Sequence, residues 1–181
     1  MFKKLLFIYF FLSFNELVLA NSFKLEKLIN LNEPWSLTFI NENEILISEK
    51  SGSLILYNKK TQKKHSVSHN LKFNDNGQGG LLEILNFKDN IYICYSEDRG
   101  KGKTSTSIAK ANFSKSDLNF NNIFQAQPPI KSGYHFGCRM VIQDAQYLYA
   151  SIGERGQGNI AQDTSKHPGS IIRINLDGSI P

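Results

Sequence analysis

A histidine and a glutamate in this sequence have the types and the placement needed for acid–base chemistry. His135 stands in the run Gly133-Tyr134-His135-Phe136-Gly137-Cys138-Arg139, and Glu154 opens the next glycine-flanked polar segment. A carboxylate that hydrogen-bonds an imidazole fixes its tautomer and raises its basicity. If the two segments lie opposite each other, His135 becomes a candidate general base. The alternative is a structural or solvent-exposed histidine.

Two glycine-rich segments offer further polar groups. Gln78 lies in Gly77-Gln78-Gly79-Gly80, where an amide could be held beside a ligand that the backbone approaches closely. No helix or lysine follows to complete a phosphate loop, so a tight turn into a strand is the alternative. Arg155, next to Glu154, could bind an anionic ligand or simply be solvated. Trp35 suits packing better than ligand stacking.

Composition bounds the kinds of protein that carry these residues. The chain has 181 residues, a formal net charge of +5, 40% hydrophobic residues and 20% charged residues. This balance excludes collagen-like, coiled-coil and wholly disordered chains. The lysines are scattered rather than gathered into a stripe, so we expect no nucleic acid partner.

The first twenty residues read as an export signal. Lys3 and Lys4 precede an apolar run over 5–14, and Val18-Leu19-Ala20 provides a cleavage site. The uncharged run is too short to span a membrane comfortably, since a span needs about 20 residues. We therefore expect residues 1–20 to be a signal peptide and residues 21–181 to be a secreted or periplasmic chain without a stable membrane anchor.

The sequence has two cysteines that could form a disulfide in an oxidising compartment. Cys94 and Cys138 allow one disulfide but do not demand it. Cys94 sits in an apolar run, which favours a buried free thiol. The four histidines show no metal-ligand spacing with cysteine, so no zinc site and no metal-ligating residue is predicted.

A three-stranded unit recurs along the chain and predicts an all-β fold. Short apolar runs with β-branched and aromatic residues alternate with polar turns near residues 42, 89 and 144, about 50 residues apart. Such repeats are typical of β-propeller blades, and a sandwich would not explain the repeated order. About three blades are predicted. Strands are expected at 36–40, 44–48 and 53–57, at 81–87, 91–96 and 104–113, and at 139–142, 147–152 and 170–175.

Hairpin pairing then places the polar candidates. Around the third turn, His135 falls opposite Glu154, because residues equidistant from a hairpin turn face each other. Gln78 and Trp35 stand at the matching open ends of the second and first hairpins. In a propeller these open ends share one rim, so the rim should collect Trp35, Gln78, His135 and Glu154.

Six motifs in order resemble a known family. The chain is similar to the N-terminal half of soluble, pyrroloquinoline quinone (PQQ)-dependent aldose sugar dehydrogenases of the glucose/sorbosone dehydrogenase family. The resemblance implies a six-bladed β-propeller with PQQ on one rim. It is carried by Pro34-Trp35-Ser36-Leu37, Gly77-Gln78-Gly79-Gly80-Leu81-Leu82, His135-Phe136-Gly137-Cys138-Arg139, Gly153-Glu154-Arg155-Gly156, Ala161-Gln162-Asp163 and Ile172-Arg173-Ile174-Asn175-Leu176-Asp177-Gly178-Ser179-Ile180-Pro181.

The same resemblance implies roles for individual residues. His135 would take the proton from the anomeric hydroxyl of an aldose while hydride passes to PQQ, and Glu154 would orient it. Gln78, Asn159 and Arg155 would contribute to the cofactor site. Tyr134 stands where the glucose-dehydrogenase branch has an acidic residue, which is closer to the broader aldose branch of the family. Cys138 stands where the family usually has glycine or serine, and Ser170 where lysine is common.

The resemblance also covers only part of the family's length. Most PQQ-clamping basic residues and calcium ligands of the family would lie beyond residue 181, so we expect a truncated chain that is inactive alone. A strand at 23–29 would lack its partner and leave an exposed edge. The alternative function is a non-catalytic binding or assembly module that self-associates through open blade edges.

Overall fold

The computed structural model describes residues 23–181, so the predicted signal peptide lies outside the described residues. Nearly all regular structure within this range is β. One short 3-10 helix, η1 (Gly158–Gln162), is the exception, and no helix of the described chain is long and apolar enough to cross a membrane. The strands are β1 Pro34–Phe39, β2 Glu44–Glu49, β3 Leu54–Asn58, β4 Lys63–His69, β5 Leu81–Phe87, β6 Asn90–Asp98, β7 Thr104–Asn112, β8 Asp117–Leu118, β9 Asn121–Gln125, β10 Gly137–Gln143, β11 Tyr147–Ile152 and β12 Ile171–Asn175.

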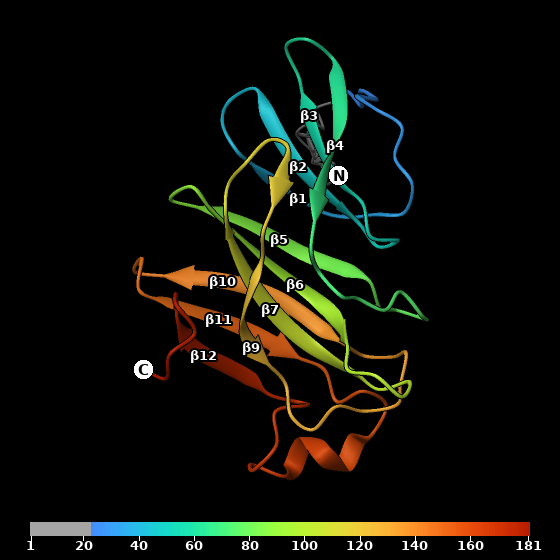
Figure 1. Cartoon of the computed structure of the whole chain (residues 1–181), viewed down its shortest axis with the longest axis vertical. Coiled ribbons are helices and arrows are strands. Elements are labelled where there is room, and N and C mark those ends of the chain that lie inside the picture. The colour runs from blue at the N-terminus through green and yellow to red at the C-terminus, as the bar shows by residue number, and fades with distance from the viewer. Residues whose placement is uncertain (1–22) are drawn as a thin grey trace, which may run out of the picture.

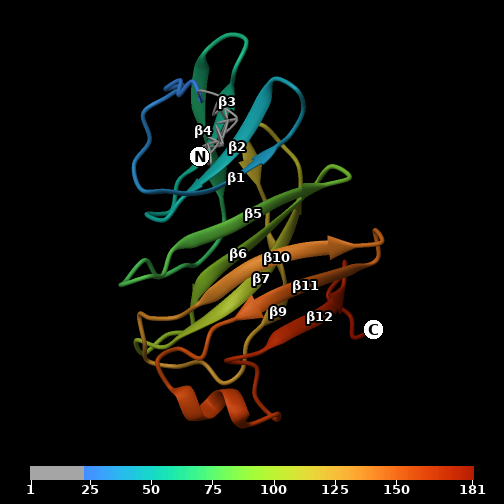
Figure 2. The same cartoon turned by 180° about the vertical axis from the view of Figure 1, so that it is seen from behind.

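Three successive sheets stack along the long axis of the molecule (Figure 1). Blade 1 has the order β1-β2-β3-β4-β8, blade 2 the order β5-β6-β7-β9, and blade 3 the order β10-β11-β12. All neighbours are antiparallel except β4 and β8. Seen from behind, the first strands β1, β5 and β10 run side by side (Figure 2). This is the arrangement of consecutive propeller blades, as the repeat predicted.

The predicted hairpins are confirmed, and the outer strands show where the sequence signal was weak. The turns join Phe39 to Ile45, Phe87 to Asn90 and Gln143 to Tyr147 in register. The fourth strands β4 and β9 were not predicted, because both are mostly polar and partly exposed. The strand expected at 23–29 is wrong: this segment is irregular, and its Ile29 packs against the outer face of blade 1.

The core lies between the blades rather than inside any one of them. Blade 2 is covered on both faces, so β6 is buried over nearly its whole length. Ile91 and Ile93 pack in the cluster shared with blade 1, whereas Tyr92 and Cys94 pack in the cluster shared with blade 3. Successive side chains of a strand point to opposite faces, which explains why this strand reads as a continuous apolar run.

Polar contacts fix the first strands against one another. The backbone N–H groups of Ile84 and Asn86 on β5 donate to the hydroxyls of Ser36 (3.3 Å) and Thr38 (3.0 Å) on β1. On the other side, the buried carboxylate of Glu83 accepts hydrogen bonds from the guanidinium of Arg139 (2.7 Å) and the backbone N–H of Met140 on β10. These contacts align the open ends of the three hairpins at one rim.

A disulfide joins Cys94 on β6 to Cys138 at the start of β10, with a Cα–Cα distance of 5.6 Å. The free-thiol interpretation of Cys94 is therefore wrong, and the disulfide that the sequence left open is present. Both cysteines are buried, so the bond lies inside the interface between blades 2 and 3. It ties the strand that begins just after His135 to the middle of blade 2.

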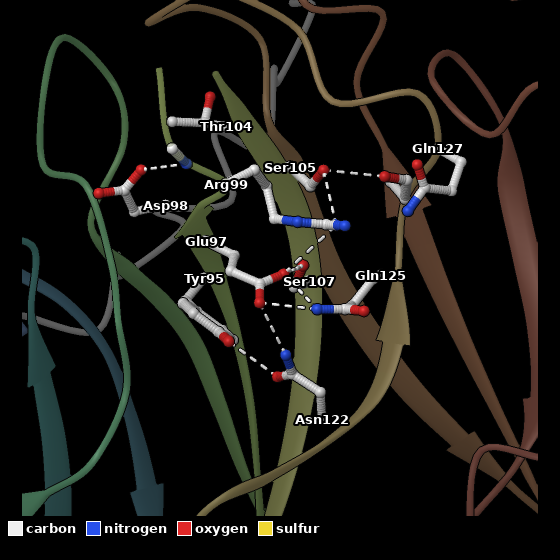
Figure 3. A network of polar contacts seen from close by, with 12 residues as sticks. Tyr95, Glu97, Asp98, Arg99, Thr104, Ser105, Ser107, Asn122, Gln125 and Gln127 are labelled. Carbon is white, nitrogen blue, oxygen red and sulfur yellow. Dashed lines mark hydrogen bonds and ion pairs between the residues drawn. The ribbon is translucent and has the colours of Figure 1, made fainter. Parts of the chain in front are cut away.

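A network around Glu97 adds side-chain hydrogen bonds to the backbone pairing of the polar strand β9 with β7 (Figure 3). The Glu97 carboxylate accepts hydrogen bonds from Ser107 (2.7 Å), Asn122 (2.9 Å) and Gln125 (2.7 and 2.8 Å). Tyr95 donates to Asn122 at 2.7 Å, and burial together with the Glu97 charge raises the pKa of Tyr95 to about 12. Side-chain hydrogen bonds thus help to hold β9, which is only partly buried, in the sheet of blade 2.

Replacing Cys138 with serine should lower the stability of the fold. A disulfide constrains the unfolded chain, and loss of one typically costs about 2–4 kcal/mol. Thermal unfolding of the wild type should shift downward when reductant is added. The Cys94→Ser/Cys138→Ser double variant is the control and should not respond to reductant. Alkylation of both thiols in denatured, unreduced wild-type protein would contradict the disulfide.

Replacing Glu97 with glutamine should weaken the attachment of β9 to β7. The amide nitrogen of glutamine meets donors from Ser107 and Gln125, and each buried donor left without an acceptor costs about 1–3 kcal/mol. We expect a lower midpoint in urea and faster amide hydrogen exchange along β9. The exposed neighbour Asp98 gives a matched control, and Asp98→Asn should change neither the urea midpoint nor the amide exchange along β9. Equal midpoints for the two variants would refute the assigned role of Glu97.

Candidate functional site

His135 and Glu154 meet at the open end of the β10–β11 hairpin. The Nδ1 atom of His135 hydrogen-bonds to Oε1 of Glu154, as the hairpin pairing predicted. The backbone N–H of Gly156 donates to the same carboxylate oxygen at 3.1 Å. The imidazole side chain is 53% exposed and the Glu154 side chain 28% exposed, so the pair is open to a ligand from solvent.

The electrostatics of the pair define what it can do. The hydrogen bond from His135 and the nearby backbone donors hold the pKa of Glu154 below its ordinary value. Glu154 is therefore a carboxylate at neutral pH, and it takes a proton-bearing Nδ1 as its donor. This leaves the lone pair of Nε2 on the far side of the ring. Such an imidazole can accept a proton from a hydroxyl placed at Nε2.

Gln78 holds the histidine from the neighbouring blade. The side-chain Oε1 of Gln78 accepts a hydrogen bond from the backbone N–H of His135 at 2.8 Å. The backbone N–H of Gln78 donates to the carbonyl of Gly133 at 2.7 Å. Gly77 has φ +61°, and a Cβ there would lie 2.5 Å from the Gly133 oxygen, which explains the glycine. The side-chain nitrogen of Gln78 makes no hydrogen bond within residues 23–181, so it can donate to a ligand.

The backbone around His135 is tightly constrained. His135 itself has φ +49°, a conformation that few non-glycine residues adopt. Gly153 comes so close that a Cβ on it would lie 1.9 Å from the His135 carbonyl oxygen. Its N–H donates to Phe136 at 3.0 Å, and the N–H of Arg155 donates to His135 at 3.3 Å. The segment after β11 therefore fixes the backbone that carries the imidazole.

Arg155 does not offer a free cation to a ligand, contrary to the expectation from the sequence. The residue is 2% exposed, and its guanidinium points into the protein. Its donors are taken by the carbonyls of Tyr134, Thr104 and Ser132 and by the Thr104 hydroxyl. A positively charged residue beside a carboxylate in a glycine-rich loop gave no signal of this inward orientation.

Asn159 and Trp35 line two separate hollows, neither of which is lined by His135. Asn159 is exposed on η1, where it lines a hollow of about 440 Å³ together with Gln157 and Asp163. No hydrogen bond in the described chain joins it to His135. Trp35 is 50% exposed and lines a separate hollow with Leu37 and Arg139. Hydrogen bonds thus join His135, Glu154 and Gln78, and none within residues 23–181 adds Asn159 or Trp35 to that cluster.

The described chain shows no metal centre of its own. Within residues 23–181, no group of three or more histidine, cysteine, aspartate or glutamate side chains is placed to hold a metal ion. Calcium therefore stays a prediction that rests on the resemblance alone. The residues that sequence reasoning missed are Thr104 and Ser132, which contact Arg155; ordinary strand and loop residues of this kind carry no distinguishing pattern.

Comparisons with known proteins identify the family of the chain. The family description "Glucose / Sorbosone dehydrogenase" matches residues 31–181. The chain is 32% identical over 161 residues to aldose sugar dehydrogenase YliI of Escherichia coli, covering 83% of this chain and 43% of that protein. The chain thus spans less than half the length of this relative.

Solved structures give the same result. The crystal structure of the soluble aldose sugar dehydrogenase from Escherichia coli, in its apo form, matches with a TM-score of 0.78 at 30% identity, over 83% of this chain and 46% of that one. The PQQ-bound aldose sugar dehydrogenase of Streptomyces coelicolor shares the fold, with a TM-score of 0.71 at 24% identity, over 82% of this chain and 46% of that one. With its blades, its rim and its match over residues 31–181, the chain belongs to the glucose/sorbosone dehydrogenase family.

Proposed function

We propose that this chain supplies the proton-accepting half of a PQQ-dependent dehydrogenase that oxidises the C1 hydroxyl of aldose sugars. The observation that carries the proposal is the pairing of an exposed His135 with the anionic Glu154 on the rim. The substrate class comes from relatives whose names describe sugar dehydrogenases. Because those relatives are about twice as long, the activity is proposed for the gene product that contains residues 23–181.

Each described residue of the cluster has a distinct task in this reaction. Glu154 keeps Nδ1 of His135 protonated and holds the ring in place, so that Nε2 faces outward to accept the proton of a sugar hydroxyl. The rising positive charge on the imidazole is stabilised by the Glu154 carboxylate, as in other base–orienter pairs. Gln78 fixes the His135 backbone through Oε1 and keeps its side-chain nitrogen for a ligand oxygen.

The described residues fit PQQ in part. PQQ is a planar quinone with carboxylates, and it asks for hydrogen-bond donors and cations. The side-chain nitrogen of Gln78 and the exposed amide of Asn159 are suitable donors, and we propose them as the residues of this chain that would hold the cofactor. Arg155 is withdrawn from this set, because its guanidinium is buried. When bound, PQQ would supply the acceptor for the hydride from C1.

We further propose that the chain is exported. The sequence of residues 1–20 has the pattern of a signal peptide, and the Cys94–Cys138 disulfide is of a kind that persists in oxidising compartments such as the periplasm. Fractionation of cells that express the tagged native gene tests this. Tagged protein that retains residues 1–20 in the cytosol would argue against export.

His135→Gln should strongly slow sugar oxidation by the native gene product assayed with PQQ, calcium, an aldose and a dye acceptor. Loss of a general base typically reduces the rate by about 10²–10⁴-fold, because the hydroxyl proton has no acceptor. The control is His65→Gln, which alters an exposed histidine on blade 1 whose imidazole hydrogen-bonds to the Lys115 carbonyl, far in sequence from the His135 cluster. Retention of kcat in His135→Gln would reject His135 as the base.

The Glu154 carboxyl should titrate below its ordinary range, and the shift should shrink in His135→Gln. The hydrogen bond from His135 is the largest cause of the lowered pKa. A lowered carboxyl pKa means that the hydrogen bond to the Glu154 carboxylate stabilises the folded protein above the ordinary pKa, and that this stabilisation is lost as the pH falls through the lowered pKa. Carboxyl carbon NMR of Glu154 in both proteins measures this. An identical midpoint in the two proteins would contradict the pairing.

A further inference from the structure

One buried charge has no part in the proposed reaction. Arg155 is 2% exposed, and no carboxylate forms a salt bridge with its guanidinium within the described chain. Burial lowers the pKa of Arg155 to about 10, so the side chain is still cationic at neutral pH. Burying a charge costs free energy unless hydrogen bonds compensate it. The groups that accept hydrogen bonds from the guanidinium therefore indicate the role of Arg155.

Those groups all belong to the segment that carries His135 or to the strand beside it. Nε donates to the carbonyl of Tyr134 at 2.9 Å, and Nη2 donates to the carbonyl of Ser132. Nη1 and Nη2 reach the carbonyl (3.2 Å) and hydroxyl (2.7 Å) of Thr104 on β7. The guanidinium carbon also lies 3.6 Å from the centre of the Phe136 ring.

The contacts of Arg155 thus bracket His135 on both sides. Its side chain binds the carbonyl before the histidine and stacks on the ring after it, while its own N–H donates to the His135 carbonyl at 3.3 Å. The anchor point, Thr104, belongs to blade 2, whereas Arg155 follows β11 of blade 3. The guanidinium therefore fixes the His135 segment relative to both blades at once.

We propose that Arg155 is a positioning residue that sets the orientation of the His135 imidazole toward Glu154 and the rim. The inference takes the base role of His135 from the proposed function. It differs from a general contribution to stability, because the guanidinium of Arg155 donates to several carbonyls around His135 and lies over the Phe136 ring at the same time. A lysine cannot do both, even though it keeps the charge.

The orientation is read directly from the ring nitrogens of His135, in the native gene product labelled with ¹⁵N at histidine and free of PQQ and sugar. In the wild type we expect one tautomer, with Nδ1 protonated and Nε2 unprotonated. Arg155→Lys should lose this pattern, with the two nitrogen shifts moving toward each other as the bond to Glu154 weakens. Thermal unfolding of each variant is recorded alongside.

Two further variants make the outcome decisive. Thr104→Val keeps Arg155 but removes one of its acceptors, and it should shift the His135 nitrogens in the same direction by less. Arg173→Lys is the matched control, since Arg173 also lies over an aromatic ring, that of Tyr147, but far along blade 3. It should leave the His135 pattern unchanged.

The results separate the two proposals. Altered His135 nitrogens in the Arg155 and Thr104 variants support positioning, even if no sugar is oxidised by the wild type. An unchanged nitrogen pattern in Arg155→Lys overturns it, even if the protein melts earlier, since that is the result of a merely structural role. If Arg155→Lys does not fold, Thr104→Val decides, and an unchanged pattern in that folded variant overturns the inference.

Discussion

Blade 2 is buried on both of its faces, and the positions of blades 1 and 3 follow from this packing. Its middle strand β6 sends alternate side chains into two separate clusters, one shared with blade 1 and one with blade 3. Neither cluster can form within a single sheet, because a sheet buries its faces only against another layer. The stacking of the blades is therefore also what brings the open ends of the hairpins to one rim.

Polar groups then refine what apolar packing sets roughly. Apolar packing alone would let one sheet slide past the next. The hydrogen bonds of Ser36 and Thr38 to β5, and of Glu83 to β10, form at only one relative position of the sheets. The disulfide at Cys138 adds a covalent link in the same interface. The result is a rim whose backbone is fixed before any ligand arrives, which is the preorganisation that acid–base chemistry needs.

Much of this arrangement could be predicted from the sequence, because it depends on the repeat of about 50 residues and on the polar residues of the turns. The short apolar runs between polar turns predicted the hairpins, and the equal distance of His135 and Glu154 from their turn predicted the pair. The outer strands β4 and β9 were missed because polar side chains, such as those of Asn122 and Gln125, attach β9 through Glu97. Such long-range side-chain bonds leave no periodic pattern.

Arg155 shows the other limit. Whether a guanidinium faces solvent or the interior depends on carbonyls of Ser132 and Thr104, which are distant in sequence and meet it only after the blades have stacked. The same is true of the disulfide, whose partners lie 44 residues apart on different blades. Sequence reasoning places residues along one hairpin well, and it places contacts between hairpins poorly.

The bond from Gln78 to the His135 backbone has a mechanical consequence. The base is carried by blade 3 but held at its N–H by blade 2, so the site sits on a joint between two sheets. A slide of one sheet past the other would turn the imidazole even if no atom of the rim were altered. Substitutions deep in the interface between blades 2 and 3, at Leu82 or Leu148 for example, can therefore change the orientation of the His135 imidazole at the rim.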